Sequence, residues 1–258
     1  MHNSVKNLIY IEDIIKSKVN HDKLPKIIAV SKTFSIENIL PLIKHGHLHF
    51  GENKVQEALD KWSEIKNDNN KIKLHFIGRL QTNKVKFALK IFDYIHSLDS
   101  EKLANKIADE QAKQEKKPKI LIQVNIGNED QKSGINKKDL KDFYKFCKNL
   151  NLDIIGTMCI PPNDCNTEKY FSEMNHINKE RLADFYSFCK NLNLDIIGTM
   201  CIPPNNGNTE KFFFEMSKVN QKLNFKELSM GMSGDYLEAI KNSATYVRVG
   251  SKIFGSRT

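Results

Sequence analysis

Short apolar runs alternate with amphipathic stretches along most of the 258 residues, and this alternation limits the possible folds more than any other feature. The runs are continuous and rich in β-branched residues, which is typical of strands covered by helices on their outer face. The stretches between them carry apolar residues at three- and four-residue steps, as amphipathic helices do. The sequence therefore predicts βα units around a parallel sheet. The predicted strands include 26–32, 47–52, 73–78, 94–99, 119–127, 226–233 and 245–255, and the predicted helices include 35–44, 54–66, 82–92, 100–113 and 137–150.

Residues 142–178 and 184–220 carry nearly the same sequence, and LNLDIIGTMCIPPN occurs in both. A solenoid would show this period along the whole chain, so the repeat is a tandem duplication of one helix-strand-helix unit. Both copies together give nine strands, whereas one copy gives eight. Because barrel closure links strand number, tilt and shear, we expect a TIM-type (β/α)8 barrel that only one copy completes. The sequence leaves open which copy this is. It also leaves open whether the seam from Thr167 to Asn191 forms a long projecting helix or a partly disordered spare unit.

The composition argues against nucleic-acid, membrane and metal-binding proteins. No Gly/Ser-rich or Pro-rich linker interrupts the chain, so residues 1–258 are expected to form a single domain. The net charge of +9 comes from lysines scattered along the chain rather than gathered on one element. Glu12 and Asp13 interrupt the apolar pattern of the N-terminus, which predicts an amphipathic helix of a cytoplasmic protein. The five cysteines show no metal-ligand spacing and are expected to be reduced.

The predicted strand IIAVSK (27–32) ends in a lysine. In a parallel barrel the functional groups lie where strands end and the following loops begin. Lys32 has the strand parity of Ile28 and Val30, which is the face expected to fill the barrel interior. An amine in that place is partly removed from water, which lowers its pKa and leaves it able to condense with an aldehyde. The alternative is a lysine that extends from the strand end into solvent.

Two glycine-containing turns follow the last two predicted strands. The first contains Ser233 and Gly234, which offer a hydroxyl and a close approach of the backbone, and it opens a helix whose free N–H groups point toward an anion. The second contains Gly250 and Ser251. Both turns fall where barrels frequently bind phosphate. The pair therefore predicts a phosphate site, with purely structural turns as the alternative.

Arg248 shares the parity of Gly250, so it should project into the same interior. A guanidinium keeps its protons, so a ring nitrogen facing it would be an unprotonated acceptor. The alternative is an ion pair with an acid on a neighbouring strand. Asn53 can hydrogen-bond a ring substituent, while His75 is expected to be a satisfied core residue. An amine for an aldehyde, a phosphate site and an arginine for a ring nitrogen together predict pyridoxal 5'-phosphate (PLP), held through a Schiff base.

At these residues the chain resembles the PLP-binding proteins of the YggS and PROSC type, a family implicated in homeostasis of that cofactor. The segments that carry the resemblance are AVSKT (29–33), HFGEN (49–53), HFIGRLQTNK (75–84), VNIGNEDQKSGI (124–135), IGTMCIPP in either copy, LSMGMSGD (228–235) and VRVGSKIFG (247–255).

The resemblance implies a barrel like the N-terminal domain of alanine racemase, with Lys32 as the Schiff-base lysine. It implies Arg248 near the pyridine nitrogen and Asn53 beside the ring. The phosphate contacts that it implies come from Ser233, Gly234, Gly250 and Ser251. Ser251 stands where threonine is expected, which keeps the hydroxyl. The duplication leaves open whether Met158 or Met200 lines the pocket.

The resemblance implies a carrier that limits free PLP and delivers it to other proteins, such as PLP-dependent apoenzymes. An amino-acid racemase or decarboxylase is the alternative, but it needs an acid/base group on the far face of the ring. In racemases of this type a second domain supplies that group, and we expect none beyond Thr258. A Schiff-base aldolase acting on a sugar phosphate is a third alternative, which would need a carboxylate or tyrosine at the mouth near Lys32, and Glu52 or Asp99 could serve. We therefore predict a monomeric, cytoplasmic, non-enzymatic binding protein with no catalytic residues and no metal, nucleic-acid or membrane partner.

Overall fold

Nine parallel strands close into a barrel in the part of the chain that the structure describes. The computed structural model describes residues 1–19, 24–125, 133–159, 197–203, 209–222 and 224–256. The barrel strands are β1 (Lys26–Val30), β2 (His49–Glu52), β3 (Lys73–Phe76), β4 (Tyr94–Leu98), β5 (Lys119–Asn125), β7 (Asp153–Cys159), β8 (Gly198–Cys201), β9 (Glu227–Met232) and β10 (Tyr246–Val249). Their order is β4-β3-β2-β1-β10-β9-β8-β7-β5, and a β4–β5 pairing closes the ring. A two-residue strand, β6 (Ile135–Asn136), pairs with β5 outside this ring.

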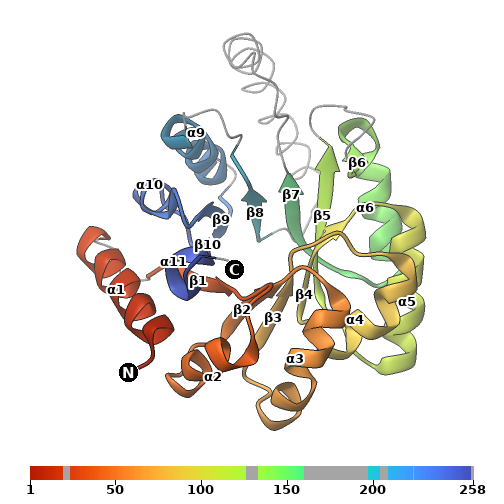
Figure 1. Ribbon diagram of the computed structural model, residues 1–258. Coiled ribbons are helices and arrows are strands. Elements are labelled where there is room, and N and C mark those ends of the chain that lie inside the picture. Colours follow the sequence, from red (N-terminus) through yellow and green to blue (C-terminus); the bar gives the residue numbers. More distant parts are fainter. Residues whose placement is uncertain (20–23, 126–132, 160–196, 204–208, 223, 257–258) are drawn as a thin grey trace.

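Helices surround the strands, as Figure 1 shows. The predicted amphipathic stretches correspond to helices α2 to α6 within one to three residues at most ends, which confirms the βα alternation. The helices are α1 (Asn3–Lys18), α2 (Ile36–Lys44), α3 (Val55–Asp68), α4 (Val85–Ile91), α5 (Glu101–Gln114), α6 (Leu140–Asn149), α9 (Thr209–Lys222), α10 (Tyr236–Lys241) and α11 (Ser251–Phe254), with short 3-10 turns η1 (Thr82–Lys84) and η2 (Lys137–Asp139).

The N-terminal helix α1 is amphipathic, as its sequence predicts. Val5, Leu8, Ile11 and Ile15 are buried at three- and four-residue steps along it. Its neighbours are α2, α10 and α11, so it packs beside the strands that begin and end the barrel. Among the described residues no helix is long and apolar enough to cross a membrane.

Both copies of the duplication contribute a strand to the barrel, so the expectation that only one copy completes it is wrong. Strand β8 pairs with β7 in register, with Gly156 opposite Gly198 and Met158 opposite Met200. The added strand therefore repeats its neighbour's pattern of inward and outward side chains without a register offset, and it presents to β9 the edge that β7 would present. A strand left out would expose unpaired backbone groups. The predicted seam from Thr167 to Asn191 lies outside the described residues.

The last predicted strand is shorter than expected. The run 245–255 was assigned to one strand, but β10 ends at Val249 and α11 begins at Ser251. Gly250 is the N-cap residue, and its carbonyl accepts hydrogen bonds from the amides of Ile253 and Phe254. The apolar residues Ile253 and Phe254 therefore lie on a short helix, where they pack against the buried apolar residues between the strands and the helices.

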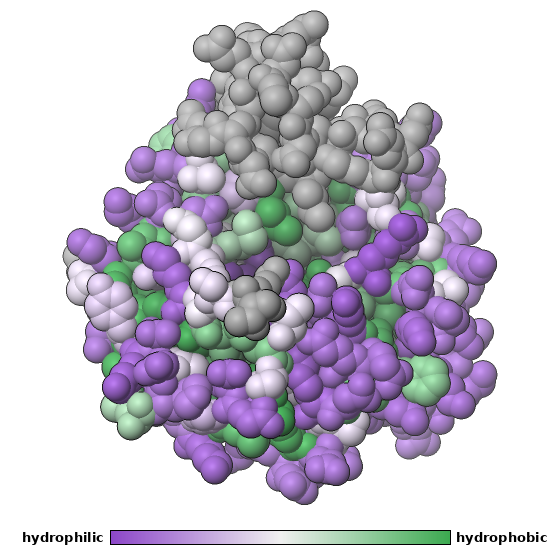
Figure 2. Space-filling view, in the orientation of Figure 1, coloured by the Kyte–Doolittle hydropathy of each residue, from purple (hydrophilic) through white to green (hydrophobic). Residues whose placement is uncertain are grey.

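Buried apolar side chains form two separate clusters, one large and one small. A large buried cluster lies between the strands and the helices and includes Phe50, Trp62 and Phe76. A separate small cluster joins Leu121, Met158 and Met200, which lie on β5, β7 and β8. On the face shown in Figure 2, hydrophilic side chains cover most of the surface and apolar ones appear in small separate groups.

Candidate functional site

The predicted Schiff-base lysine lies in the turn directly after β1. Ile28 and Val30 lie 3.2 and 3.6 Å from the position that a Cβ on Gly51 would occupy. Neither belongs to the large cluster between strands and helices, so this face of β1 points into the barrel. Lys32 is half-buried in the turn that follows. The next residue, Thr33, has a left-handed backbone with φ of 68°. A threonine holds this conformation only where its surroundings enforce it.

Glu52 ends β2 beside this turn but does not point into the barrel mouth. Its side chain is fully buried, and its Oε1 accepts hydrogen bonds from Ser31 Oγ at 2.7 Å and from Trp62 Nε1 at 3.0 Å. Trp62 belongs to the outer cluster between sheet and helices. Glu52 therefore faces α3, which removes it as the mouth carboxylate that an aldolase would need.

The turn after β9 has the geometry that its glycines predict. Gly231 has φ of +90°, and a Cβ there would lie 2.5 Å from that of Ala239, so a side chain is excluded. The amide of Met232 donates to Asp235 Oδ1 at 2.6 Å, and the amide of Asp235 donates to the Met232 carbonyl at 3.2 Å. Ser233 and Gly234 thus lie in a closed turn, and nothing lies within 4 Å of a Cβ on Gly234.

The two predicted phosphate turns contact each other. The amide of Gly250 donates a hydrogen bond to Ser233 Oγ at 3.1 Å. A Cβ on Gly250 would lie 3.2 Å from the carbonyl oxygen of Val30, so this turn also packs against the end of β1. The structure therefore brings the two glycine turns together, two residues from Lys32. Ser251, the first residue of α11, is exposed.

Arg248 is buried and held by neutral groups. It is 5% exposed and pairs in register with Ile28 across β10 and β1. Its Nη1 donates to the Ser229 carbonyl and to Ser229 Oγ, and its Nη2 donates to the Cys201 carbonyl at 2.8 Å. Burial lowers the pKa of the guanidinium from its usual value. Among the described residues Arg248 forms no salt bridge. A guanidinium has five N–H groups, so donors remain for another acceptor.

Asn53 has a buried side-chain oxygen, Oδ1, without a hydrogen-bond partner among the described residues. Buried polar atoms in native proteins are nearly always paired, so this oxygen has the capacity to accept a hydrogen bond from a bound group. Gly78, which follows β3, packs directly on this residue, because a Cβ on Gly78 would lie 2.2 Å from the Asn53 carbonyl oxygen. A buried oxygen without a partner, a guanidinium with spare donors and two joined glycine turns are features compatible with a phosphorylated pyridine ring.

Three histidines on the neighbouring strands β2, β3 and β4 form a hydrogen-bonded chain, which the sequence analysis did not predict. His49 Nδ1 lies 3.0 Å from His75 Nε2, and His75 Nδ1 lies 3.1 Å from His96 Nε2. Both ring nitrogens of His75 are therefore paired, which confirms its prediction as a satisfied buried residue. Burial, with Arg248 as the charged neighbour, lowers the pKa of His96 to about 3. Burial also lowers the pKa of His49 to about 4. One signal in the sequence could have indicated this chain: His49 has the strand parity of Gly51, and His75 has that of Ile77, so both rings face the barrel interior. Whether the rings meet depends on the register between the strands, which the sequence does not give.

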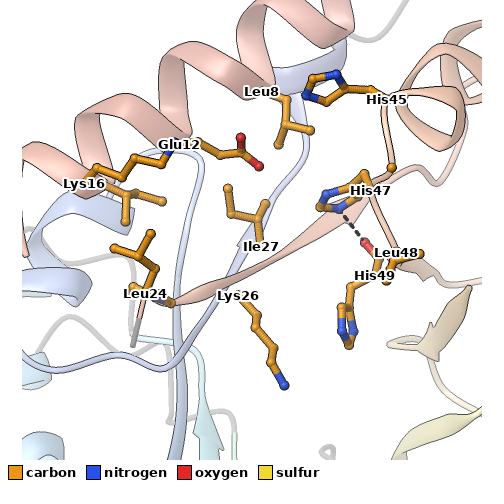
Figure 3. A pocket seen from close by; sticks show the side chains of 13 residues that line it. Leu8, Glu12, Lys16, Leu24, Lys26, Ile27, His45, His47, Leu48 and His49 are labelled. Carbon is orange, nitrogen blue, oxygen red and sulfur yellow. Dashed lines mark hydrogen bonds between the residues drawn. The ribbon is translucent and has the colours of Figure 1, made fainter. Parts of the chain in front are cut away.

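A hollow of about 470 Å³ lies at the opposite end of the barrel, between α1 and the starts of β1 and β2. Figure 3 shows Leu8 and Glu12 of α1 facing Ile27, while the Lys26 side chain points away from α1; the His47 ring donates a hydrogen bond to the His49 carbonyl beside them. This hollow contains none of the predicted site residues, which lie where the strands end. We therefore place the candidate site at the carboxyl ends of β1, β9 and β10.

Both copies of the duplicated methionine are buried in the second cluster, and which of them lines a ligand pocket stays a prediction. Met158 and Met200 both lie in this cluster, opposite each other on β7 and β8. Cys147, Cys159 and Cys201 are free thiols, as expected, and burial raises the pKa of Cys159 to about 12. Among the described residues no group of histidines, cysteines and acids could hold a metal ion. The remaining two cysteines and much of segment 124–135 lie outside the described residues.

Comparisons with known proteins agree with this geometry. Residues 13–201 match the family model described as "Alanine racemase, N-terminal domain". A curated "Pyridoxal phosphate homeostasis protein" of Pasteurella multocida is 32% identical over 97% of this chain and 96% of its own length. One of the same name from Aquifex aeolicus is 32% identical over 90% of this chain and 87% of its own length. PipY of Synechococcus elongatus, solved with PLP bound, aligns with a TM-score of 0.66 and 26% identity, covering 98% of this chain and all of PipY.

The fold thus belongs to the class of the alanine racemase N-terminal domain. An alanine racemase of Clostridium difficile shares the fold with a TM-score of 0.59 at 15% identity, and the match covers 98% of this chain but 56% of the racemase. The match to curated relatives over nearly the full length is more specific. The chain belongs to the pyridoxal phosphate homeostasis protein family.

Proposed function

We propose that this protein binds PLP, holds it through a Schiff base to Lys32 and takes part in PLP homeostasis. PLP supplies an aldehyde, and the amine of Lys32 would capture it. The observation that carries the proposal is the hydrogen bond from the Gly250 amide to Ser233 Oγ, in a turn that packs on Val30 at the end of β1. It joins the two candidate phosphate turns beside the end of β1, two residues before the lysine. PipY, a relative by fold and sequence, has been solved with PLP bound.

Each of the other site residues has a role that its surroundings support. Ser233, Gly234, Gly250 and Ser251 would hold the phosphate, the serines through their hydroxyls and Gly234 through its backbone N–H group. Gly250 would act through its amide, which donates to Ser233 Oγ and so orients that hydroxyl. Arg248 would donate to the pyridine nitrogen, since its carbonyl and hydroxyl partners leave N–H groups over. These contacts are neutral or charge-assisted donors, which suit a dianionic phosphate and an unprotonated ring nitrogen.

Asn53 would contribute the last contact. Its unpaired Oδ1 would accept a hydrogen bond from a ring substituent, which would satisfy the buried oxygen.

The role that we propose is that of a carrier rather than a catalyst. The curated relatives are named as homeostasis proteins, whereas the racemases share the fold alone. Arg248 keeps its protons even when buried, so a ring nitrogen facing it stays unprotonated and withdraws electrons weakly. Among the described residues, Glu52 is engaged by Ser31 and Trp62 and is not available as an acid/base group. The proposal includes residues 1–258 acting as one monomeric domain in the cytoplasm, with PLP-dependent apoenzymes as recipients.

The test is reductive trapping on the full chain. Purified protein is mixed with PLP, the visible absorbance of the Schiff base is recorded, borohydride is added, and the labelled peptide is mapped. We expect the label on Lys32, and we expect Lys32→Ala to remove both absorbance and label. Lys26→Ala is the matched control, because Lys26 lies at the other end of the same strand. A label on any other lysine would contradict the assignment.

The second part of the test separates carrier from enzyme. Amino acids are added to the PLP-loaded protein, and chirality and decarboxylation are followed over time. The carrier role predicts no sustained turnover. Turnover that Lys32→Ala abolishes and Lys26→Ala leaves intact would instead establish a racemase or decarboxylase.

A further inference from the structure

The half-buried ammonium of Lys61, on α3, contacts the turn that contains Lys32. The side chain of Lys61 is 11% exposed. Its Nζ donates to the carbonyls of Ser31 and Phe34, at 3.0 and 3.3 Å, which are the residues that flank Lys32 and Thr33. The Phe34 amide in turn donates to the Ser31 carbonyl at 3.2 Å, which closes the turn. One side chain therefore connects both ends of the turn to a helix that lies outside the barrel.

Two carboxylates hold the same ammonium and the same turn. Lys61 Nζ lies 2.8 Å from Glu52 Oε1 and 2.8 Å from Glu57 Oε1. Ser31 Oγ donates to Glu52 Oε1 at 2.7 Å, and the amide of Thr33 donates to Glu57 Oε1 at 2.6 Å. The carboxylates thus bind the turn on one side and the ammonium on the other.

This network explains how the strained turn is maintained. Thr33 has φ of 68°, a conformation that needs enforcement by its surroundings. Its amide is fixed by Glu57, and the carbonyls on either side of the Lys32–Thr33 pair are fixed by Lys61. The position of the Lys32 backbone is therefore set by the three charged groups of this network.

We propose that Lys61 is a positioning residue for Lys32: by bridging Glu52, Glu57 and the turn, it holds the Lys32 backbone where the amine meets the PLP aldehyde. The effect on capture of PLP rests on the proposed function, whereas the contacts of Lys61 with the turn do not. A reacting group held in place reacts much faster than one on a loose segment, because little orientational freedom remains to be lost. Lys61 itself would not contact PLP.

The chain offers a matched control on the same helix. Lys66 is 14% exposed, and its Nζ donates to a carbonyl, that of Ile72, and to a carboxylate, Asp93 Oδ2, both at 2.8 Å. These partners lie near the starts of β3 and β4, at the far end of the barrel from Lys32. Lys61→Met and Lys66→Met each remove one half-buried ammonium from α3, but only the first touches the Lys32 turn.

Two measurements on the PLP-free protein test the geometry without PLP. The first is amide hydrogen exchange of segment 31–34. The second is competitive acetylation of Lys32 across a pH series, read by mass spectrometry. We expect Lys61→Met to speed exchange at this segment by about tenfold or more and to change the acetylation profile of Lys32. We expect Lys66→Met to change neither.

A third measurement follows the rate at which added PLP forms the Schiff base. Lys61→Met should slow this rate by about tenfold or more, in line with the cost of misplacing a reacting group. Lys66→Met should leave it unchanged, and Lys61→Arg, which keeps the cation, should restore part of the loss. Glu57→Ala is the second variant, and it serves if Lys61→Met does not fold. It removes the acceptor of the Thr33 amide at a partly exposed site, so we expect the same effects as for Lys61→Met.

The outcomes separate the inference from the function. Equal effects of Lys61→Met and Lys66→Met, or no effect of Lys61→Met and Glu57→Ala on exchange and acetylation, would overturn the positioning role. A borohydride label on a residue other than Lys32 in the unmodified protein would overturn the proposed function. In that case the exchange comparison would still decide whether Lys61 holds the turn.

Discussion

Acidification should destabilise this protein by charging histidines that the fold buries in neutral form. His96 is 4% exposed and His75 is 2% exposed, and the two rings are hydrogen-bonded. Burial lowers the pKa of both below 6.5, and Arg248 adds to the effect on His96. Because the folded-state pKa is the lower one, this contribution to stability is complete above the unfolded-state value. It is lost as the pH falls from about 6.5 toward the folded-state value.

The magnitude follows from the pKa of His96. A shift from 6.5 to about 3 means that the folded state binds almost no proton at pH 5, while the unfolded state is almost fully protonated. Proton linkage then removes about 2 kcal/mol from the free energy of unfolding between pH 7 and pH 5 for this one residue. His75 acts in the same direction. The loss is a large fraction of the 5–15 kcal/mol, in round terms, that stabilises a typical domain.

The assay is urea unfolding at pH 7 and pH 5. The single tryptophan, Trp62, is fully buried, so its fluorescence reports the transition. His96→Gln cannot titrate, and we expect it to lessen the difference between the two pH values by about 2 kcal/mol. A wild-type protein equally stable at both pH values would refute the reasoning. So would a His96→Gln variant that kept the full difference.

Two further predictions concern close packing and the duplication. Gly78→Ala should cost about 1–3 kcal/mol of unfolding free energy and weaken PLP binding, because the new Cβ would lie 2.2 Å from the Asn53 carbonyl. Gly46→Ala, with open space but φ of +98°, should cost only about 1 kcal/mol in the same urea assay. Deletion of residues 160–201 should give an eight-stranded barrel whose unfolding free energy is no lower than that of the full chain; a protein that is insoluble or unfolds without cooperativity would contradict this.

Much of the fold could be predicted because its signals are local. Each strand run and each amphipathic stretch carries its own period, so β1 to β5 and α2 to α6 follow from short segments. The end of β10 could not be predicted, because VRVGSKIF reads as one apolar run while its last four residues form a helix after Gly250. The strand number could not be predicted either, because identical segments do not state which neighbours they will pair with.

For the candidate site, too, local signals could be used for prediction, whereas contacts between distant segments could not be predicted. Lys32, Ser233 and Arg248 stay predictions, and they could be proposed from the sequence because functional residues of parallel barrels gather at strand ends and glycine turns mark those ends. The contact between Gly250 and Ser233, which are 17 residues apart in the sequence, depends on β9 and β10 lying side by side. The contacts of Lys61 with the Lys32 turn depend on how α3 packs over β1 and β2, which no local pattern in the sequence states.

The duplication shows why this barrel can absorb a whole unit without losing its candidate site. The two copied strands lie side by side in register, so the first faces β5 and the second faces β9, each as a single strand would. Arg248 donates to the carbonyl of Cys201, in the second copy, and Cys159 is the register partner of that residue in the first. A single-copy barrel would therefore offer Arg248 the same carbonyl from the same sequence. The additional strand lies between β9 and β5, away from β1 and β10. Lys32, Ser233 and Gly250 therefore have the same neighbours on β1, β9 and β10 in a barrel of eight strands and in one of nine.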